Sequence, residues 1–133
     1  MSNFKTARHL GSWAGVCPGN NQSAGRSRSA RNPRGNRFIK RILVQVALAA
    51  AQTRKAYARA LYQRIAIRRG KGRAILAVAN SLIQAIWYML SQKVKYEDLG
   101  IDYYQRQDQG KKTRSLVKQL ERLGHRVTLE PAA

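Results

Sequence analysis

RAILAVANSLIQAIWYMLS, residues 73–91, is the most apolar stretch of the chain. Its large apolar residues recur at three- and four-residue spacing, which is typical of a helix that is buried over a wide face. They are Ile75, Leu76, Val78, Leu82, Ile83, Ile86, Trp87 and Leu90. Within it, residues 74–90 have about the shortest length that can span a membrane, but Asn80, Ser81 and Gln84 interrupt them. The pattern therefore predicts a helix in the middle of a protein core.

The preceding segment, residues 37–69, predicts a long helical element with room for a kink. In its first part the apolar residues again recur at helical spacing, at Ile39, Leu43, Val46, Ala47 and Ala50. Further apolar residues widen this stripe, so we expect this part to be largely buried. Its second part, residues 55–69, has the pattern of an amphipathic basic helix. Gly70 and Gly72 then predict a short turn, across which the two long elements pack antiparallel.

Shorter helices are expected on both sides of this pair. Thr6 can cap a helix that runs to Ala14, and Gly15 supplies a stop signal. Near the other end, residues 111–123 predict a last helix, and residues 126–130 alternate as a short strand-like arm. The apolar side of the last helix consists of Leu116, Val117, Leu120 and Leu123.

These patterns together predict an all-α fold: a long antiparallel helical pair with short flanking helices and a Gly/Ser/Arg-rich site loop. The chain of 133 residues has room for one domain with one modest core. Hydrophobic residues make up 44%, which favours a folded chain in spite of its charge. We place the whole chain, 1–133, in a single domain, with the site loop at 15–37 and the helical core at 37–123.

The charge of the chain predicts a polyanionic partner. Lysine and arginine number 26 against 6 acidic residues, a formal net charge of +20, which makes DNA or RNA the expected partner. An anionic membrane surface is the competing partner. It calls for exposed aromatic residues on a basic helix, whereas both tryptophans lie in apolar segments, so we expect no membrane partner.

The site loop, GVCPGNNQSAGRSRSARNPRGNR at residues 15–37, is too rich in Gly, Asn, Ser and Pro for regular structure. Its second half and the start of the next helix carry six cations and no acid: Arg26, Arg28, Arg31, Arg34, Arg37 and Lys40. Ser23, Ser27 and Ser29 lie among or beside them. A hydroxyl among guanidinium groups suits phosphodiester chemistry. A flexible nucleic-acid contact is the plainer interpretation of such a loop.

The residues WAGVCPGNNQSAGR (13–26) and RGNR (34–37), with the helix that follows, resemble transposases of the insertion-sequence one-ten family. The resemblance extends to DLGIDYYQRQD (98–108) and LGHRVTLEP (123–131). Members of this family are bridge-RNA-guided DNA recombinases. They pair a RuvC-like DEDD domain with a C-terminal transposase domain that carries a nucleophilic serine.

The resemblance implies a function in DNA transposition and recombination and assigns the nucleophile to Ser23. It implies DNA, a guide (bridge) RNA and a RuvC-like DEDD domain as partners. Mg²⁺ is expected on that domain and no cofactor in this chain. The RuvC-like part is missing from this sequence, so we expect a fragment of a longer recombinase that is inactive alone. A bacterial cytoplasmic location, at the nucleoid when bound to DNA, and a homo-oligomer are further expectations.

The sequence offers little else that could bind a metal or act as a nucleophile. Cys17 is the single cysteine, and His9 and His125 lie far from each other, so no zinc-binding spacing exists. Four of the six acids, Glu97, Asp98, Asp102 and Asp108, fall close together. In a chain of this charge we expect them to pair with arginines, and we predict no metal site.

Two other classes of function stay open. A non-catalytic basic nucleic-acid-binding module explains the charge and the loop without any chemistry. A basic ribosome-associated protein explains the charge but not the match around Ser23.

Overall fold

The computed structural model describes residues 3–19, 21–29, 32 and 34–130. Its elements follow the order α1 (Ala7–Trp13), β1 (Asn21–Ser23), β2 (Arg26–Ser29), α2 (Arg37–Gln52), α3 (Tyr57–Arg69), α4 (Lys71–Gln92) and α5 (Tyr103–Arg122). The predicted all-α class is confirmed. Within the part of the chain that the structure describes, β1 and β2 form one small hairpin in what was expected to be an irregular loop.

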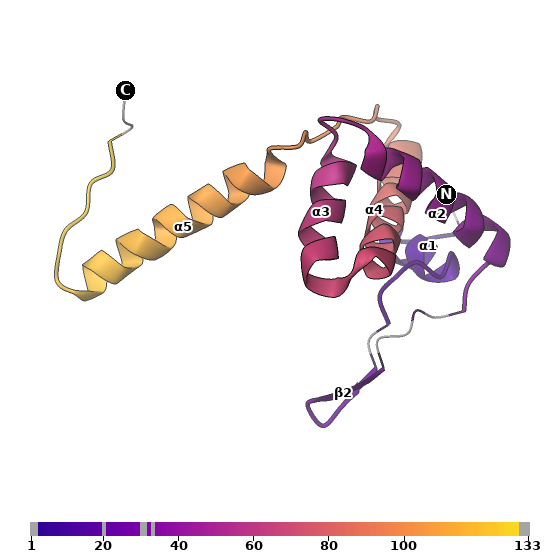
Figure 1. Ribbon diagram of the computed structural model, residues 1–133, viewed down its shortest axis with the longest axis horizontal. Helices are drawn as coiled ribbons and strands as arrows, with labels where there is room; N and C mark the ends of the chain where they lie inside the picture. The colour runs from indigo at the N-terminus through magenta and orange to yellow at the C-terminus, as the bar shows by residue number, and fades with distance from the viewer. Residues whose placement is uncertain (1–2, 20, 30–31, 33, 131–133) are drawn as a thin grey trace.

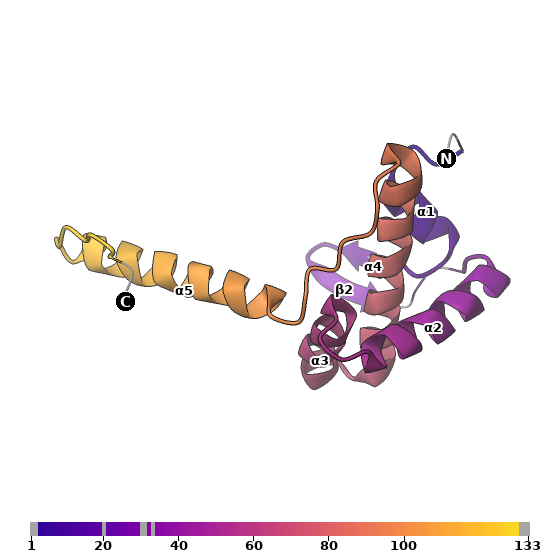
Figure 2. The ribbon, with the colours of Figure 1, turned by 90° about the horizontal axis from the view of Figure 1, so that it is seen from above.

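Helix α4 is the centre of the core, as its apolar pattern predicts. It packs against α1, α2 and α3, which surround it (Figures 1 and 2). Its buried residues are Ala74, Ile75, Val78, Ala79 and Ile83. The helix is also long and apolar enough to cross a membrane, but the core helix of a soluble protein meets the same test. Its contacts with three other helices bury these five residues, whereas Ile86 and Leu90 near its end remain 42% and 60% exposed.

The long element before α4 is two helices instead of one kinked helix. α2 ends at Gln52, and Thr53, whose hydroxyl donates to the Ala49 carbonyl (3.2 Å), has an extended backbone. Lys55 then adopts a positive φ of 62°, which no helix can continue through. α3 returns along α4 and is joined to it at Gly70, so these two helices form the antiparallel pair (Figure 1).

The expectation that the first part of this element is largely buried is wrong. Only Leu43 and Ala47 of α2 are buried, because its contacts with α4 and α3 leave the rest of the helix uncovered. Phe38, Ile42 and Val46 lie four residues apart and are 71%, 55% and 47% exposed. The extra apolar residues of α2 therefore form an uncovered stripe instead of a second packing face.

The start of the chain is fastened to α4 by caps and aromatic contacts. The Thr6 hydroxyl accepts a hydrogen bond from the His9 backbone N–H (3.3 Å), which confirms the predicted cap of α1. The Trp87 indole N–H donates to the Phe4 carbonyl at 3.0 Å, and the Phe4 ring lies 5.4 Å from the ring of Trp13. α1 is thereby held across one side of the central helix.

Helix α5 begins at Tyr103, eight residues before the predicted 111–123, and projects away from the core (Figures 1 and 2). None of its residues is buried, and it contacts only α3 among the helices. The predicted apolar side is therefore uncovered, with Leu116, Leu120 and Leu123 between 43% and 74% exposed. The strand-like arm at 126–130 is not a strand, because no neighbouring strand lies beside it in the described residues.

The attachment of α5 to α3 relies on side chains. The Asp98 carboxylate accepts from the backbone N–H of Tyr57 (2.9 Å), so it caps α3 from 41 residues away, and also from that of Gly100 (2.7 Å). The rings of Tyr57 and Tyr104 stack at 5.5 Å, and their hydroxyls lie 2.8 Å apart. Burial raises the pKa of Tyr104, and its hydrogen bond with Tyr57 raises it further.

Candidate nucleic-acid interface

The site loop is a hairpin arm that leaves and rejoins the core at one point. Where the chain returns, Gly35 lies directly against the backbone at Ala14 and Gly15: a Cβ on Gly35 would lie 2.2 Å from the Gly15 nitrogen. The Asn36 backbone N–H donates to the Trp13 carbonyl at 3.0 Å beside this contact. Only glycine can occupy position 35 at such a distance. We call this close approach the Gly35 crossing.

Above the crossing, the arm ends in a tight two-residue turn. β1 and β2 pair antiparallel, with Ser23 opposite Arg26, and Ala24 and Gly25 form the turn between them. Both turn residues have positive φ, 50° and 75°, as a type I′ turn requires. Glycine adopts this conformation freely, whereas at Ala24 it costs about 1–2 kcal/mol. Ser23 therefore lies at the last paired position before a strained turn, in the hairpin whose strand β2 is at the far end of the arm (Figure 1).

The predicted cations are distributed along the arm and into the next helix, and the structure does not gather them into one cluster. Arg26 and Arg28 lie on β2, Arg34 precedes the crossing, and Arg37 and Lys40 lie in the first turn of α2. Arg31 lies outside the described residues. Arg26, Arg34 and Arg37 are exposed, and none of the three has an ion-pair partner among the described residues. The pairing of Ser23 with Arg26 is the one place where the structure joins the predicted nucleophile to a predicted cation.

The start of α2 is a second cationic feature of this region. The Asn36 side-chain oxygen caps the helix by accepting from the backbone N–H of Phe38 (3.0 Å) and Ile39 (3.1 Å). Arg37 and Lys40 follow at once, and cations near the positive end of a helix cost a few tenths of a kcal/mol each. A bound phosphate would remove that cost.

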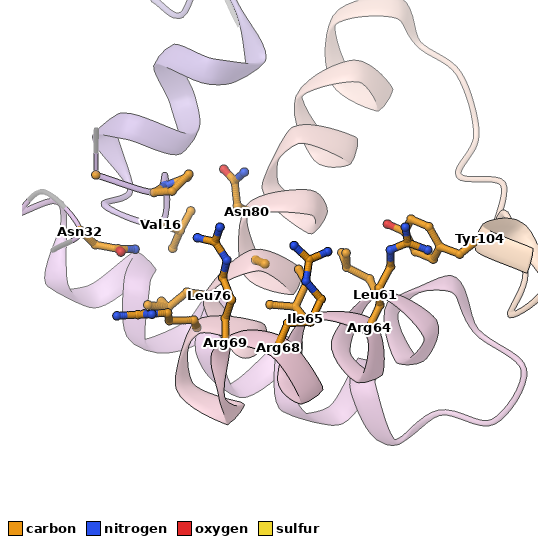
Figure 3. Close-up of a pocket in the computed structure, with 14 residues that line it drawn as sticks. Val16, Asn32, Leu61, Arg64, Ile65, Arg68, Arg69, Leu76, Asn80 and Tyr104 are labelled. Carbon is orange, nitrogen blue, oxygen red and sulfur yellow. The ribbon is translucent and has the colours of Figure 1, made fainter. Parts of the chain in front are cut away.

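Residues at the base of the arm form a cleft together with α3 and α4. It has a volume of about 440 Å³, and we call it the basic cleft. Val16, Pro18, Gly19 and Asn32 from the base of the arm line one wall. Four arginines, Arg64, Arg68, Arg69 and Arg73, line the side formed by α3 and the start of α4. Figure 3 shows Arg68 and Arg69 pointing from α3 into the cleft in the direction of Asn80.

One of these arginines is already paired. The Arg64 guanidinium contacts both carboxylate oxygens of Asp108, at 2.5 and 3.3 Å, and lies 4.7 Å over the Tyr104 ring. The hydrogen bond from Arg64 lowers the pKa of Asp108 below its ordinary value. Arg68, Arg69 and Arg73 have no acidic partner within the described ranges. The cleft thus keeps three uncompensated positive charges.

Sequence reasoning missed the basic cleft. It identified residues 55–69 as a basic amphipathic helix, but it did not distinguish arginines that face a cavity from arginines that face solvent. A signal existed in Arg68, Arg69 and Arg73, which crowd around the Gly70 turn. That signal becomes meaningful only when the fold brings the base of the arm against the same turn.

The remaining polar groups near the arm have structural roles. The Cys17 thiol donates weakly to the Asn80 side-chain oxygen (3.5 Å) and to the Arg8 carbonyl (3.7 Å). Burial raises the pKa of Cys17, although Arg8 partly offsets this, so the thiolate that a nucleophilic cysteine needs is disfavoured. Asp108 pairs with arginine as expected, whereas Asp98 binds backbone N–H groups instead. The described residues contain no group of three or more His, Cys, Asp or Glu that could hold a metal ion.

A comparison with protein-family models gives a match over the part of the chain that contains the arm. Residues 1–63 match the family model described as transposase IS116/IS110/IS902 family. The match covers α1, the hairpin arm, α2 and the first half of α3. Neither the curated proteins nor the solved structures that were compared gave a match to the chain. Over these first 63 of its 133 residues, the chain is similar to the IS116/IS110/IS902 family of transposases.

Proposed function

We propose that this chain binds DNA and supplies Ser23 as the nucleophile that cleaves and rejoins a DNA strand. The single observation that carries the proposal is the family match over residues 1–63, which include the arm with Ser23 at its end. The match to a transposase family supports a general role in DNA transposition or recombination, with DNA as a partner.

The proposed step is a transesterification at phosphorus. The Ser23 oxygen attacks the phosphorus of a DNA phosphodiester and forms a new P–O bond, while the bond to one strand oxygen breaks. The serine proton passes to a base, and the departing oxygen takes up a proton to become a strand hydroxyl. The strand end is then esterified to the protein, so the reverse reaction with another hydroxyl rejoins DNA without ATP.

The arrangement of the arm supports this step. The extra negative charge of the transition state needs cations close to the phosphorus. Arg26 is the register partner of Ser23 across the hairpin, so a phosphate bound by Arg26 lies next to the serine position. Arg28, Arg31, Arg34, Arg37 and Lys40 extend the proposed phosphate contacts toward α2. The strain at Ala24 is of the kind that functional turns retain.

The described residues do not fit the magnesium ion that the family resemblance implies. They contain no group of three or more potential metal ligands, so we assign no step to a metal held by this chain. We propose that the acidic residues come from a RuvC-like DEDD domain that assembles with it, and that a guide RNA selects the DNA. Homo-oligomerisation and a bacterial cytoplasmic location remain predictions.

The test is a trapped protein–DNA adduct. The chain is assembled with a DEDD-bearing partner and its guide RNA, denatured, and the modified peptide is mapped by mass spectrometry. Ser23→Ala should abolish the adduct while leaving DNA affinity unchanged. Ser27→Ala and Ser29→Ala are matched controls on the same hairpin and should retain it. A phosphodiester link on Ser27, Ser29 or Cys17 would show that the nucleophile is assigned wrongly.

A non-catalytic nucleic-acid-binding module is the second candidate function. The observation that favours it is the basic cleft, whose three unpaired arginines bind anions without any catalytic group. This candidate predicts salt-sensitive binding with no adduct under any assembly. Binding that is insensitive to salt between about 50 and 200 mM would contradict both candidates, because each relies on phosphate contacts.

A further inference from the structure

We infer that the basic cleft binds an unpaired nucleotide of a single-stranded segment, with the base against the apolar floor and the adjoining phosphates on Arg68, Arg69 and Arg73. The inference deepens the proposed function, because it rests on nucleic acid being the partner of this chain and names the form of nucleic acid that the cleft selects.

The floor of the cleft is apolar and accessible. Leu61 and Ile65 of α3 and Leu76 of α4 line it and are only half-buried, with Val16 of the arm buried behind them. A site for phosphate alone gains nothing from exposed aliphatic side chains. A base offers a flat apolar face that can lie on them, and it offers this face only when it is not stacked inside a duplex.

The size of the cleft suits a single nucleotide. Pockets for small ligands have volumes of roughly 300–1,000 Å³, and the cleft, at about 440 Å³, lies at the low end of that range. A DNA duplex cannot enter such a space with its bases paired. The cleft therefore favours one base that is unpaired or turned out of a helix over a continuous duplex.

The rim of the cleft carries arginines that can bind phosphate. Arg68 and Arg69 lie in the last turn of α3, and Arg73 lies in the first turn of α4 beyond Gly70. These three like charges have no acidic partner among the described residues, and an anion between them would relieve their repulsion. Guanidinium groups bind phosphate oxygens in paired hydrogen bonds, so phosphates on either side of a seated base are suitable occupants.

A buried donor points to a ligand in the same place. The Asn32 side-chain nitrogen lines the cleft, is buried, and has no hydrogen-bond partner within the described structure. Figure 3 shows this side chain directed from the loop toward the interior of the cleft. A buried donor that stays unpaired is unfavourable. A base carbonyl or a phosphate oxygen would satisfy it, whereas an apolar ligand would not.

The cleft is separated from Ser23 by only a short length of chain. Gly19 lines the cleft and lies four residues before Ser23, a length of chain that spans at most about 14 Å. Stacked nucleotides along one strand are about 3.4 Å apart, so this reach equals about four nucleotides. A nucleotide seated in the cleft would fix which phosphate near it lies at the end of the arm.

The test compares the affinity of the whole chain for short oligothymidine and for a duplex of equal phosphate count, by fluorescence anisotropy. Arg68→Ala with Arg69→Ala should weaken single-strand binding at least tenfold, and more than duplex binding. It should also reduce the single-strand salt slope by about 1.4. Lys111→Ala with Lys112→Ala removes the same charge from exposed positions on α5 outside the cleft, and should affect both nucleic acids equally.

Two further measurements distinguish binding of a nucleobase in the cleft from electrostatic attraction of phosphate by the arginines. Ala77 lines the cleft, so Ala77→Phe fills it without changing charge and should reduce single-strand binding while duplex binding is retained. A series of oligothymidines, each with one abasic position, should show one position whose loss weakens binding roughly tenfold. This series uses the unaltered protein and so does not depend on any variant folding.

Equal losses for single strand and duplex in the arginine variant, together with equal binding of every abasic oligonucleotide, would overturn the cleft assignment. That result would leave the proposed function intact, since the Ser23 adduct is measured separately. Conversely, base seating without any Ser23 adduct would support the cleft and contradict catalysis. Oligouridine compared with oligodeoxyuridine shows whether the segment is RNA or DNA, because these two differ only in the 2′-hydroxyl.

Discussion

The hairpin arm and helix α5 both project from the same four-helix core, but they are attached to it by different forces. The arm is joined through backbone atoms, at the Gly35 crossing and the Asn36-to-Trp13 hydrogen bond. α5 is joined through side chains, by Asp98 on the start of α3, Arg64 on Asp108 and the stacked tyrosines. Among the residues whose burial the structure describes, neither projection contributes a large buried apolar surface of its own.

Because of this difference, the attachments of the two projections should depend differently on pH and salt. Backbone packing is insensitive to pH and salt, so the attachment of the arm that carries Ser23 should not change with conditions. Ion pairs and carboxylate hydrogen bonds weaken with acid or salt, so the orientation of α5 depends on conditions.

Gly35→Ala should destabilise the protein by about 4 kcal/mol or more, because its Cβ would lie 2.2 Å from the Gly15 backbone nitrogen and neither backbone can yield. Urea unfolding measures this change. Gly72→Ala is the matched control in α4, where a Cβ would meet nothing within 4 Å. It should be neutral or stabilise by up to about 1 kcal/mol. Similar unfolding midpoints for the two variants would show that the crossing is not a constraint.

Ala24→Gly should stabilise the hairpin by about 1 kcal/mol, since it removes the strain of a positive φ at a residue with a Cβ. The gain in hairpin stability should be measurable as slower hydrogen exchange of the Arg26 amide. The same substitution at Ala49, an exposed position inside α2, should destabilise by about 1 kcal/mol. If both changes have the same sign, the turn is not strained.

Asp98→Asn should reduce the stability of the α3 start by less than about 1 kcal/mol at neutral pH, because the carboxylate is largely exposed. Burial alone would raise the pKa of Asp98, but hydrogen bonds from the Tyr57 and Gly100 N–H groups and the Tyr96 hydroxyl lower it below 3.8. The stabilisation is therefore complete above the unfolded pKa and is lost as pH falls through the folded value.

Urea unfolding at pH 7 and near pH 3 checks this sign. The difference between the native protein and Asp98→Asn should shrink in acid. Glu97→Gln, at the neighbouring exposed position, is the matched control and should leave the free energy of unfolding at pH 7 unchanged. A difference that grows in acid would contradict the role of Asp98 as a cap.

Asp108→Asn should leave global unfolding unchanged within error, because its ion pair with Arg64 is exposed. The effect should appear instead as faster hydrogen exchange in the first turns of α5. About 1 M salt should reproduce that increase in the native protein, since screening then acts over about 3 Å. The amides of α4 serve as the internal reference, and equal acceleration there would show that α5 is not separately attached.

Much of the fold could be predicted because its signals are local. Apolar spacing identified α4 as the core helix, Thr6 and Gly15 bounded α1, and Gly70 marked the turn between α3 and α4. The start of α5 was missed, because tyrosines and glutamines at 103–110 carry little apolar periodicity. The burial of α2 was overestimated because an apolar stripe does not reveal whether a neighbour covers it.

The candidate site also has a part that the sequence predicts and a part that it does not. Ser23 and the cations near it were accessible to sequence reasoning, since they are close together along the chain and carry the family resemblance. Their catalytic role remains a prediction. The basic cleft was not accessible, because its walls come from the base of the arm, α3 and α4, and no local pattern connects them.

The all-α class, the central helix, the charge and the loop that matches the transposase family can be recognised without the structure. These follow from periodicity, capping and composition, which act within a few residues or sum over the whole chain. Only the tertiary structure decided that Gly35 closes the arm, that Asp98 caps α3 and that three arginines share a cleft. Each of those contacts joins residues that are far apart in sequence, so its energy depends on where the packed helices place them.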